Sequence, residues 1–473
     1  MRPLELALHT RSAAFIWAAI TAIAALAVAA GLPEDGLRVS IAGFWWLALC
    51  SLAVIATLVL RVGVWSAAGA YAAVFWCFHF GLIAVLAAGF VRPTDLSSWD
   101  QNWVFGPFAA DAAIVALAAS LALASGITLV HGLGSRNPDP ASMHLRAPAH
   151  PHGTAGSVLV LTTAAIWCGI VLASSGTKGF FNSYSDYLQA TADFGSGLGF
   201  VWLGLGCGVV LSVTGKPGWL RTGAIAAFCT VALLALPLGL RGEILFPSMA
   251  VLVASARCGR ALPPGRAALL VLGLLALIPC VREIRNTGLQ GLPGVVLELR
   301  LFDSFVEMGG SLHPVEKVVR WHAEGEPFEL GSSYWAPIER AAARILPGLQ
   351  TPAAEDDMRI MNVLVTDRVG AIGFSPVAEA YRNFGAFGVV IVLGALGALL
   401  ASIDRLADRR TAVLAIATLY VPLLTNVRNS FISVPTQCLV GILFVVLLGA
   451  MRHVSSSVVC RPYARPPYVR SEI

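Results

Sequence analysis

The chain has 473 residues, of which 57% are hydrophobic and 12% are charged, and its formal net charge is +5. Soluble domains carry about 25% charged residues, so this composition excludes a chain that is solvated mainly by water. The basic residues are scattered and do not form the Lys/Arg-rich patch with interleaved aromatic residues that binds nucleic acid. We therefore expect an integral membrane protein with no nucleic-acid partner.

Apolar runs recur along most of the chain, and a helix needs roughly 20 apolar residues to cross a bilayer core of about 30 Å. Charged or Pro/Gly-rich breaks separate these runs, which predicts transmembrane helices joined by loops. In chain order the runs cover residues 13–31, 41–60, 65–91, 109–130, 157–173, 197–213, 223–240, 243–256, 267–281, 384–403, 411–427 and 430–451. The predicted fold class is all-α: a polytopic integral membrane protein with about twelve transmembrane helices in a single domain, residues 1–473.

Two of these runs have unusual features. The run at 243–256 is short for a full crossing and contains Glu243, so we expect it to be tilted, shifted or partly re-entrant. The first run follows MRPLELALHTR and ends in AVAAG, a pattern that is also typical of a signal peptide. In a chain with many spans, we expect this run to remain as an uncleaved first helix.

The cysteine and histidine patterns do not indicate a metal site. Most of the nine cysteines fall inside apolar runs, where a thiol behaves as a small hydrophobic group. The sequence contains no Cys-x-x-Cys pair, and its nine histidines do not form a His-Glu-x-x-His motif. We therefore expect no metal and no cofactor.

The bias of Lys and Arg toward the cytoplasm predicts the orientation of the bundle. With both termini inside, the inner segments hold most of the basic residues, and the short outer loops hold only Arg38, Arg92, Lys178, Arg241 and Arg428. This orientation places a large non-spanning segment, residues 282–383, outside the membrane. Helically spaced apolar residues in VVLELRLFDSFVEM, HPVEKVVRWHAEG and SYWAPIERAAARIL predict amphipathic helices in this loop that lie over the membrane domain.

Several arginines lie on the predicted outer side of the membrane, where the bias of Lys and Arg toward the cytoplasm disfavours them. Arg241, Arg382 and Arg428 lie at the outer ends of three separate hairpins, and Arg282 and Arg285 begin the large loop. A guanidinium stays charged and binds phosphate through two-point contacts, but it is a poor proton carrier. The pattern therefore predicts an anion site. The alternative is that each arginine reaches to lipid headgroups or pairs with a carboxylate such as Glu243, Glu283 or Glu379.

Proton transfer requires another type of residue. Glu379 and His313 are the candidate general bases on the outer face, because a carboxylate or an imidazole can accept a proton at neutral pH. Glu379 could equally form a structural salt bridge, and His313, which precedes Pro314, could cap a helix. Aromatic rings that could stack on sugars are those of Tyr184, Tyr187, Tyr334 and Trp335, although such residues are also typical interface anchors.

The C-terminal part of the chain contains GGSLHPVEKVV, ELGSSYWAPIERAAARILPG and GFSPVAEAYRNFGAFGVVIVLGALGALL. These segments resemble the Wzy-type polymerases that join oligosaccharide repeat units in O-antigen and exopolysaccharide pathways. In that family a large outer loop ends in a Glu-x-x-x-Asn-Phe-Gly-x-x-Gly pattern that opens a span, matched here by Glu379, Asn383, Phe384, Gly385 and Gly388. The earlier GLRGEILFP resembles the family's arginine-glycine motif, so the resemblance covers roughly residues 241–405.

The resemblance implies a polyprenyl-pyrophosphate-dependent glycosyltransferase in the bacterial cytoplasmic membrane, with an extracytoplasmic active face. A glycan on undecaprenyl pyrophosphate would be transferred to an incoming lipid-linked repeat unit, in O-antigen, capsule or exopolysaccharide synthesis. A flippase and a chain-length regulator of the same pathway would be its partners. No Asp-x-Asp motif is present to hold a nucleotide-bound cation, so arginines would take the place of a metal. The predicted catalytic residues are Glu379, His313 and Arg382, and the predicted substrate-binding residues are Arg241, Arg428, Arg282, Arg285, Asn383 and Tyr334.

Other functions fit parts of the same pattern. An O-antigen ligase shares the topology and the donor but transfers the glycan to lipid A core. A transporter or flippase fits the number of spans, but transporters tend to have internal repeats and broken midplane helices, which this sequence lacks. A polyprenyl-phosphate sugar transferase would use acidic residues in its first outer loop, yet Glu34 and Asp35 in PEDG fit an ordinary turn. A non-catalytic assembly scaffold is a further alternative.

Overall fold

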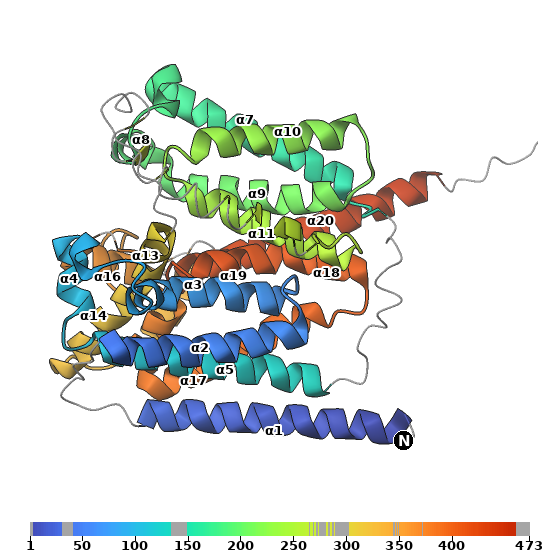
Figure 1. Cartoon of the computed structure of the whole chain (residues 1–473). Coiled ribbons are helices and arrows are strands. Elements are labelled where there is room, and N and C mark those ends of the chain that lie inside the picture. The colour runs from blue at the N-terminus through green and yellow to red at the C-terminus, as the bar shows by residue number, and fades with distance from the viewer. Residues whose placement is uncertain are drawn as a thin grey trace, which may run out of the picture.

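A computed structural model of the chain describes residues 3–30, 41–133, 149–263, 265–267, 269–270, 273, 281, 284–285, 288, 302–343, 346, 348, 350–370 and 372–459. These residues form helices and no strand, which confirms the all-helical class predicted from the apolar runs. The long helices lie side by side in a bundle, with shorter helices gathered at one end (Figure 1).

One half of the bundle is built mainly from the first part of the chain. Its helices α1, α2, α3 and α5 pack through α1 against α5, α2 against α3 and α5, and α5 against the later helix α17. The bounds are α1 Pro3–Ala30, α2 Ile41–Val62, α3 Ala67–Ala87, α5 Ala109–Leu133 and α17 Pro376–Asp404. This half buries much of the larger hydrophobic core, including Phe75, Phe80 and Leu123.

The other half contains four further helices, in which α7 packs against α9 and α10, and α9 against α11. Their bounds are α7 Gly153–Ser175, α9 Gly195–Thr214, α10 Trp219–Ala235 and α11 Arg241–Arg257. The C-terminal helices lie between the two halves (Figure 1). They are α18 Arg409–Ala415, the π-helix η6 Ile416–Tyr420, α19 Val421–Asn426 and α20 Val434–Val459.

Short helices cover one end of the bundle, on the left in Figure 1. They come from four separate stretches of sequence. The α-helices are α4 Ser98–Val104, α8 Tyr184–Ala190, α13 Asp303–Gly309, α14 His313–Ala323, α15 Ser332–Ala343 and α16 Met361–Arg368. The 3-10 helices are η1 Pro93–Asp95, η2 Gly176–Phe180, η3 Ala192–Phe194, η5 Gly310–Leu312 and η7 Phe431–Ser433.

Seven helical segments in the described part of the chain are long and apolar enough to cross a membrane. They are Gly43–Val62, Ala67–Ala87, Ala109–Gly132, Gly153–Phe180, Gly197–Thr214, Pro376–Asp404 and Phe431–Leu448, and Ile16–Ala30 and Trp219–Ala235 are shorter apolar helices. A multi-pass membrane protein follows from these segments. The count of about twelve spans stays a prediction, as does the single domain 1–473, and most of the predicted span 267–281 lies outside the described residues.

The predicted outer loop, residues 282–383, contains α13, α14, α15 and α16. The helices predicted from HPVEKVVRWHAEG and SYWAPIERAAARIL correspond to α14 and α15, while much of VVLELRLFDSFVEM lies outside the described residues. Its extracytoplasmic position stays a prediction.

Helix α17 begins earlier than the apolar run 384–403. The Ser375 hydroxyl caps it by accepting the Ala378 N–H at 3.1 Å, and Pro376 occupies the first turn. Gly385 then interrupts the helix with a φ of +67°, a conformation that glycine adopts without steric cost. A short arm, residues 376–384, therefore precedes the longer apolar arm.

Glycines let α17 lie very close to α5. A Cβ on Gly126 would lie 1.9 Å from the Gly394 carbonyl oxygen, and one on Gly397 would lie 2.3 Å from the Leu123 oxygen. Small residues at such crossings allow backbones to approach closely, which is typical of packing between membrane helices. The long arm of α17 is thus fixed against α5, and this contact positions the short arm at the end of the bundle that carries the short helices.

Candidate functional site

Arg241 is the first residue of α11, and its side chain is 10% exposed. Its two terminal nitrogens donate hydrogen bonds to the two carboxylate oxygens of Glu307 in α13, which is 13% exposed. A planar guanidinium and a planar carboxylate paired at two points fix each other's orientation. The ion pair therefore holds the α10–α11 turn to the short helix α13.

A second arginine, Arg285, lies against the same turn. A Cβ on Gly239 would come within 2.7 Å of the Cδ of Arg285. The Arg285 side chain can therefore pack against the turn only because residue 239 has no side chain. Gly239 has a φ of +83°, which also favours glycine. The guanidinium of Arg285 lies over the Tyr184 ring, 4.2 Å from the ring centroid. This cation–π contact joins the start of the predicted outer loop to α8.

Arg428, which follows α19, is the third arginine of this group. Its backbone carbonyl accepts the Phe374 N–H at 3.1 Å, which fixes the loop just before α17. Burial lowers the pKa of Arg428, the attraction of Glu307 raises it, and the like charges of Arg241 and Arg285 lower it. A guanidinium remains charged in proteins even after such a shift. We call Arg241, Arg285 and Arg428 the arginine cluster.

Two carboxylates share the surroundings of the arginine cluster. Glu307 pairs with Arg241 and attracts Arg428, and Glu243, in the first turn of α11, is influenced by all three arginines. Among the described residues, three guanidinium groups thus face two carboxyl groups. The predicted binding residue Arg282 and its neighbour Glu283 lie outside the described residues.

Arg382 has a different set of partners. Its Nη2 lies 2.9 Å from Glu326 Oε2, its Nε donates to Glu329 Oε1 at 3.1 Å, and its guanidinium lies 5.9 Å from the Trp321 ring centroid. The structure therefore brings together three of the arginines singled out from the sequence and places Arg382 in a separate ion-pair group. That Arg382 takes part in catalysis stays a prediction.

The break at Gly385 frees two carbonyl groups at the end of the short arm of α17. The Arg382 oxygen accepts the Glu329 N–H at 3.1 Å, and the Asn383 oxygen accepts the Leu330 N–H at 3.0 Å. We call residues 328–334 the strap, since they run along this arm. A Cβ on Gly385 would lie 2.9 Å from the Phe328 ring, so glycine allows both the break and the approach of the strap.

Glu379 and Asn383 fasten the strap and a second loop to the short arm. Glu379 Oε1 accepts the Ser333 hydroxyl at 2.8 Å, and its Oε2 accepts the Phe431 N–H at 2.6 Å. The Asn383 amide donates to the Ser333 hydroxyl and to the Glu379 carbonyl, each at 2.8 Å, and its Oδ1 accepts the Gly331 N–H at 2.9 Å. The glutamate and asparagine of the predicted motif thus form a buried network of hydrogen bonds.

Aromatic rings lie beside this network. The Tyr334 ring is parallel to that of Phe384, with centroids 6.1 Å apart, and Phe431 packs edge-on against it at 5.2 Å. Burial and the nearby Glu379 raise the pKa of Tyr334, so its hydroxyl stays protonated. Trp335 is 61% exposed and remains accessible for a surface contact.

His313 begins α14 in different surroundings. Its ring stacks on Trp103 with centroids 4.7 Å apart and meets the edge of Trp99 at 4.5 Å. Burial, followed by the charges of Lys317 and Arg320, lowers the pKa of His313 to about 3. The imidazole is therefore neutral at pH 7 and is a weak base.

Several residues of these groups were not singled out from the sequence, among them Glu307 and Ser333. Glu307 is an acid in the largely apolar segment FVEM, and its presence there was the only available signal. Ser333 gave no such signal, because the sequence does not show that it faces Glu379. Among the described residues, no group of three or more His, Cys, Asp or Glu side chains is placed to hold a metal ion.

Similarity to known proteins identifies the family of the chain. The model of the family described as O-antigen polysaccharide polymerase Wzy matches residues 157–455, a range that contains the arginine cluster, the strap and α17. The chain is 31% identical over 202 residues to Protein CapE of Staphylococcus aureus, a match that covers 43% of this chain and 44% of that protein. No solved structure matches the chain. Because the family match covers more than half of its residues, the chain belongs to the O-antigen polysaccharide polymerase Wzy family, as its C-terminal motifs predicted.

Proposed function

We propose that this protein polymerises oligosaccharide repeat units carried on a polyprenyl diphosphate, and that the arginine cluster binds the diphosphate. The observation that carries this proposal is the convergence of Arg241, Arg285 and Arg428, from separate parts of the sequence, around the first turn of α11. The bundle offers an apolar surface for a polyprenyl chain, and the cluster offers positive charge for its headgroup. Guanidinium groups suit phosphate because they bind it at two points.

In the proposed reaction, the bond between the anomeric carbon of the growing glycan and the diphosphate oxygen breaks. A hydroxyl of the incoming lipid-linked repeat unit forms the new glycosidic bond and releases its proton to a base. The electron pair of the broken bond leaves with the polyprenyl diphosphate, where the arginine cluster stabilises the developing charge. Such preorganised electrostatic stabilisation is commonly the largest contribution to catalysis.

The motif residues on α17 take supporting roles in this proposal. Glu379 and Asn383 hold the strap and the loop before Phe431, which also carries Arg428. The two carboxylate oxygens of Glu379 accept the hydrogen bonds that hold the strap and this loop, and we therefore assign it a positioning role. Arg382, which pairs with Glu326 and with Glu329 of the strap, also holds the strap to the short arm. His313 is too weakly basic to accept a proton efficiently at neutral pH.

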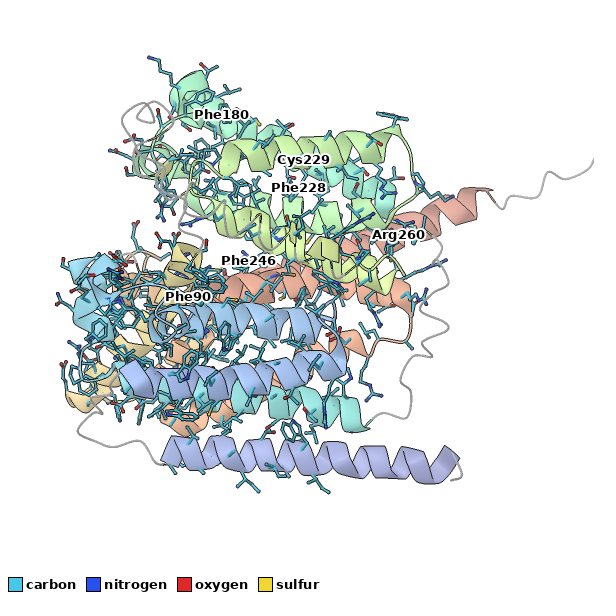
Figure 2. All side chains as sticks on the ribbon, viewed as in Figure 1. Phe90, Phe180, Phe228, Cys229, Phe246 and Arg260 are labelled. Atoms are coloured by element: carbon cyan, nitrogen blue, oxygen red, sulfur yellow. The ribbon has the colours of Figure 1, made fainter. Side chains whose placement is uncertain are left out.

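The proposal includes the bacterial cytoplasmic membrane, with the short-helix end facing outward. Its support is the bias of Lys and Arg toward the segments at the opposite end. Figure 2 labels Arg260 at that opposite end, and Phe90 at the end where the short helices lie. A flippase that delivers the lipid-linked repeat unit and a regulator of chain length would act beside the protein on the same substrate.

The experiment is to incubate the purified protein with a polyprenyl-diphosphate-linked repeat unit and to analyse the products by electrophoresis and mass spectrometry. A polymerase yields a ladder of lipid-linked glycans and releases about one polyprenyl diphosphate for each new glycosidic bond. A ligase would yield no ladder and would consume the donor only when lipid A core is added. Either that result, or no reaction with a substrate of the correct repeat unit, would contradict the proposal.

A further inference from the structure

Glu307 pairs with the guanidinium of Arg241, which in the proposed function binds the diphosphate. Both terminal nitrogens of Arg241 are engaged by the two Glu307 oxygens, and these same two donors are the ones that a phosphate group would take. Glu307 is also the carboxylate that attracts Arg428. A lipid diphosphate and Glu307 therefore compete for the same positive charges.

The backbone of α13 is not free to withdraw from this position. A Cβ on Gly309 would lie 2.1 Å from the Leu82 nitrogen, and one on Gly81 would lie 2.9 Å from the Phe305 oxygen, so α13 packs directly on α3. With the backbone of α13 held in this way, rotation of the Glu307 side chain can release Arg241. This side chain is 13% exposed and its partner is 10% exposed, which leaves the pair within reach of a ligand.

We propose that Glu307 is an exchangeable counter-ion, which the lipid diphosphate displaces from Arg241 on binding and which recaptures Arg241 when the product leaves. The inference rests on the proposed function, because it assumes that the arginine cluster binds a diphosphate. Glu307 here is a positioning residue: it sets how tightly the leaving polyprenyl diphosphate is held, and it takes no part in bond making or breaking.

The charges of the described residues favour this reading. Among the described residues, three guanidinium groups face two carboxyl groups, those of Glu307 and Glu243, so positive charge exceeds negative charge before any ligand binds. A diphosphate ester carries several negative charges, and together with both carboxylates it would make the site negative. Rotation of Glu307 away from Arg241 reduces this repulsion. Exchange of one anion for another also avoids leaving a buried guanidinium unpaired, which is costly.

The test compares the wild-type protein with Glu307→Gln, a variant of the same size that lacks the negative charge. The measurement is the dissociation constant of undecaprenyl diphosphate for the purified protein in nanodiscs, together with its inhibition constant in the polymerisation assay. Loss of a charge-assisted pair corresponds to about a tenfold change or more in affinity. We expect Glu307→Gln to bind the lipid diphosphate about tenfold more tightly and to show stronger product inhibition.

Two further variants make the result specific. Glu339→Gln removes a carboxylate that pairs with Arg359 at 2.5 Å, away from the arginine cluster, and should leave both constants unchanged. Glu307→Asp keeps the charge but shortens the side chain, and should tighten binding less than Glu307→Gln. If Glu307→Gln is too unstable to purify, Glu307→Asp still decides the question, since unchanged or weaker binding would contradict the inference.

The binding measurements distinguish failure of this inference from failure of the proposed function. If the wild-type protein binds undecaprenyl diphosphate and Glu307→Gln binds it equally or less tightly, Glu307 is a structural partner of Arg241 and the inference fails. If the wild-type protein does not bind the lipid diphosphate at all, the proposed function fails first. Tighter binding in Glu339→Gln as well would show a general charge effect and would also overturn the inference.

Discussion

The backbone N–H of Phe431 donates to Glu379 Oε2 at 2.6 Å, across 52 positions of sequence. This bond fastens the first turn of α17 to the loop that also contains Arg428, and the other oxygen of the same carboxylate holds the strap through Ser333. One buried side chain thus ties together two segments on which the candidate site depends. The motif on α17 is therefore explained by what it holds in place.

Arg428→Lys is expected to lower the rate of polymerisation about a hundredfold or more, because removal of one preorganised donor from a developing anion commonly has this effect. Lysine keeps the positive charge but lacks the planar fork. The rate of ladder formation should be measured at equal amounts of folded protein. Arg260→Lys, an exposed position at the other end of the bundle, is the matched control (Figure 2). Wild-type chain lengths from Arg428→Lys would remove this residue from the proposed clamp.

Glu379→Gln separates a positioning role from that of a general base. Loss of a general base typically costs between about a hundredfold and ten-thousandfold in rate and removes one limb of the pH profile. A glutamine can still accept one of the two hydrogen bonds, so we expect a smaller loss, about tenfold, which corresponds to the loss of one hydrogen bond. Ser333→Ala should give a similar partial loss. A loss of a thousandfold in Glu379→Gln, with Ser333→Ala unaffected, would assign Glu379 to proton transfer.

Gly385→Ala is expected to destabilise the protein and to lower its activity. A side chain at a φ of +67° and a ψ of −163°, a region essentially limited to glycine, costs about 1–3 kcal/mol, and the new Cβ would lie 2.9 Å from the Phe328 ring. Thermal unfolding in detergent gives the loss of stability. Gly394→Ala in the same helix is the control, since its Cβ would meet only the Ala122 oxygen at 3.7 Å. Equal melting temperatures for the two variants would show that the break in α17 does not require glycine.

His313→Phe tests the burial of an uncharged imidazole. The pKa of this group is about 3 in the folded protein and 6.5 in its ordinary state, so the unfolded chain binds more protons between these values. The contribution of this group to the free energy of unfolding is therefore fully present above pH 6.5 and is lost as the pH falls toward 3. The loss is no more than about 1.4 kcal/mol per pH unit. Phenylalanine can keep the stacking on Trp103 and removes this titration. An acid dependence of unfolding that is identical in both proteins would contradict the assignment.

Much of the helical architecture could be predicted from the sequence, because an apolar run of sufficient length has few alternatives to a membrane helix. The runs 41–60 and 109–130 correspond closely to α2 and α5. The start of α17 was less predictable: apolarity begins near Phe384, whereas the cap at Ser375 fixes the helix boundary nine residues earlier. A prediction from hydropathy follows the apolar run and does not detect a helix cap that lies outside it.

The sequence allowed prediction of which residue types form the candidate site, but it allowed less prediction of which side chains pair with one another. The arginines stood out because their charge opposes the orientation signal, and three of them do converge. The pairing of Arg241 with Glu307 spans 66 positions, and that of Arg382 with Glu329 spans 53, so no local pattern could predict either. Likewise, a glutamate in a motif suggests chemistry or structure equally well until its hydrogen-bond partners are known.

The central claim is that the arginine cluster holds the lipid diphosphate, and photo-crosslinking tests it most directly. A polyprenyl diphosphate with a photoreactive group on its headgroup should be irradiated with the purified protein, and the labelled peptides identified by mass spectrometry. The account predicts labels around Arg241, Arg285 and Arg428 that are lost when unmodified undecaprenyl diphosphate is added in excess. Competable labelling confined to the opposite end of the bundle, around Arg260, would contradict it.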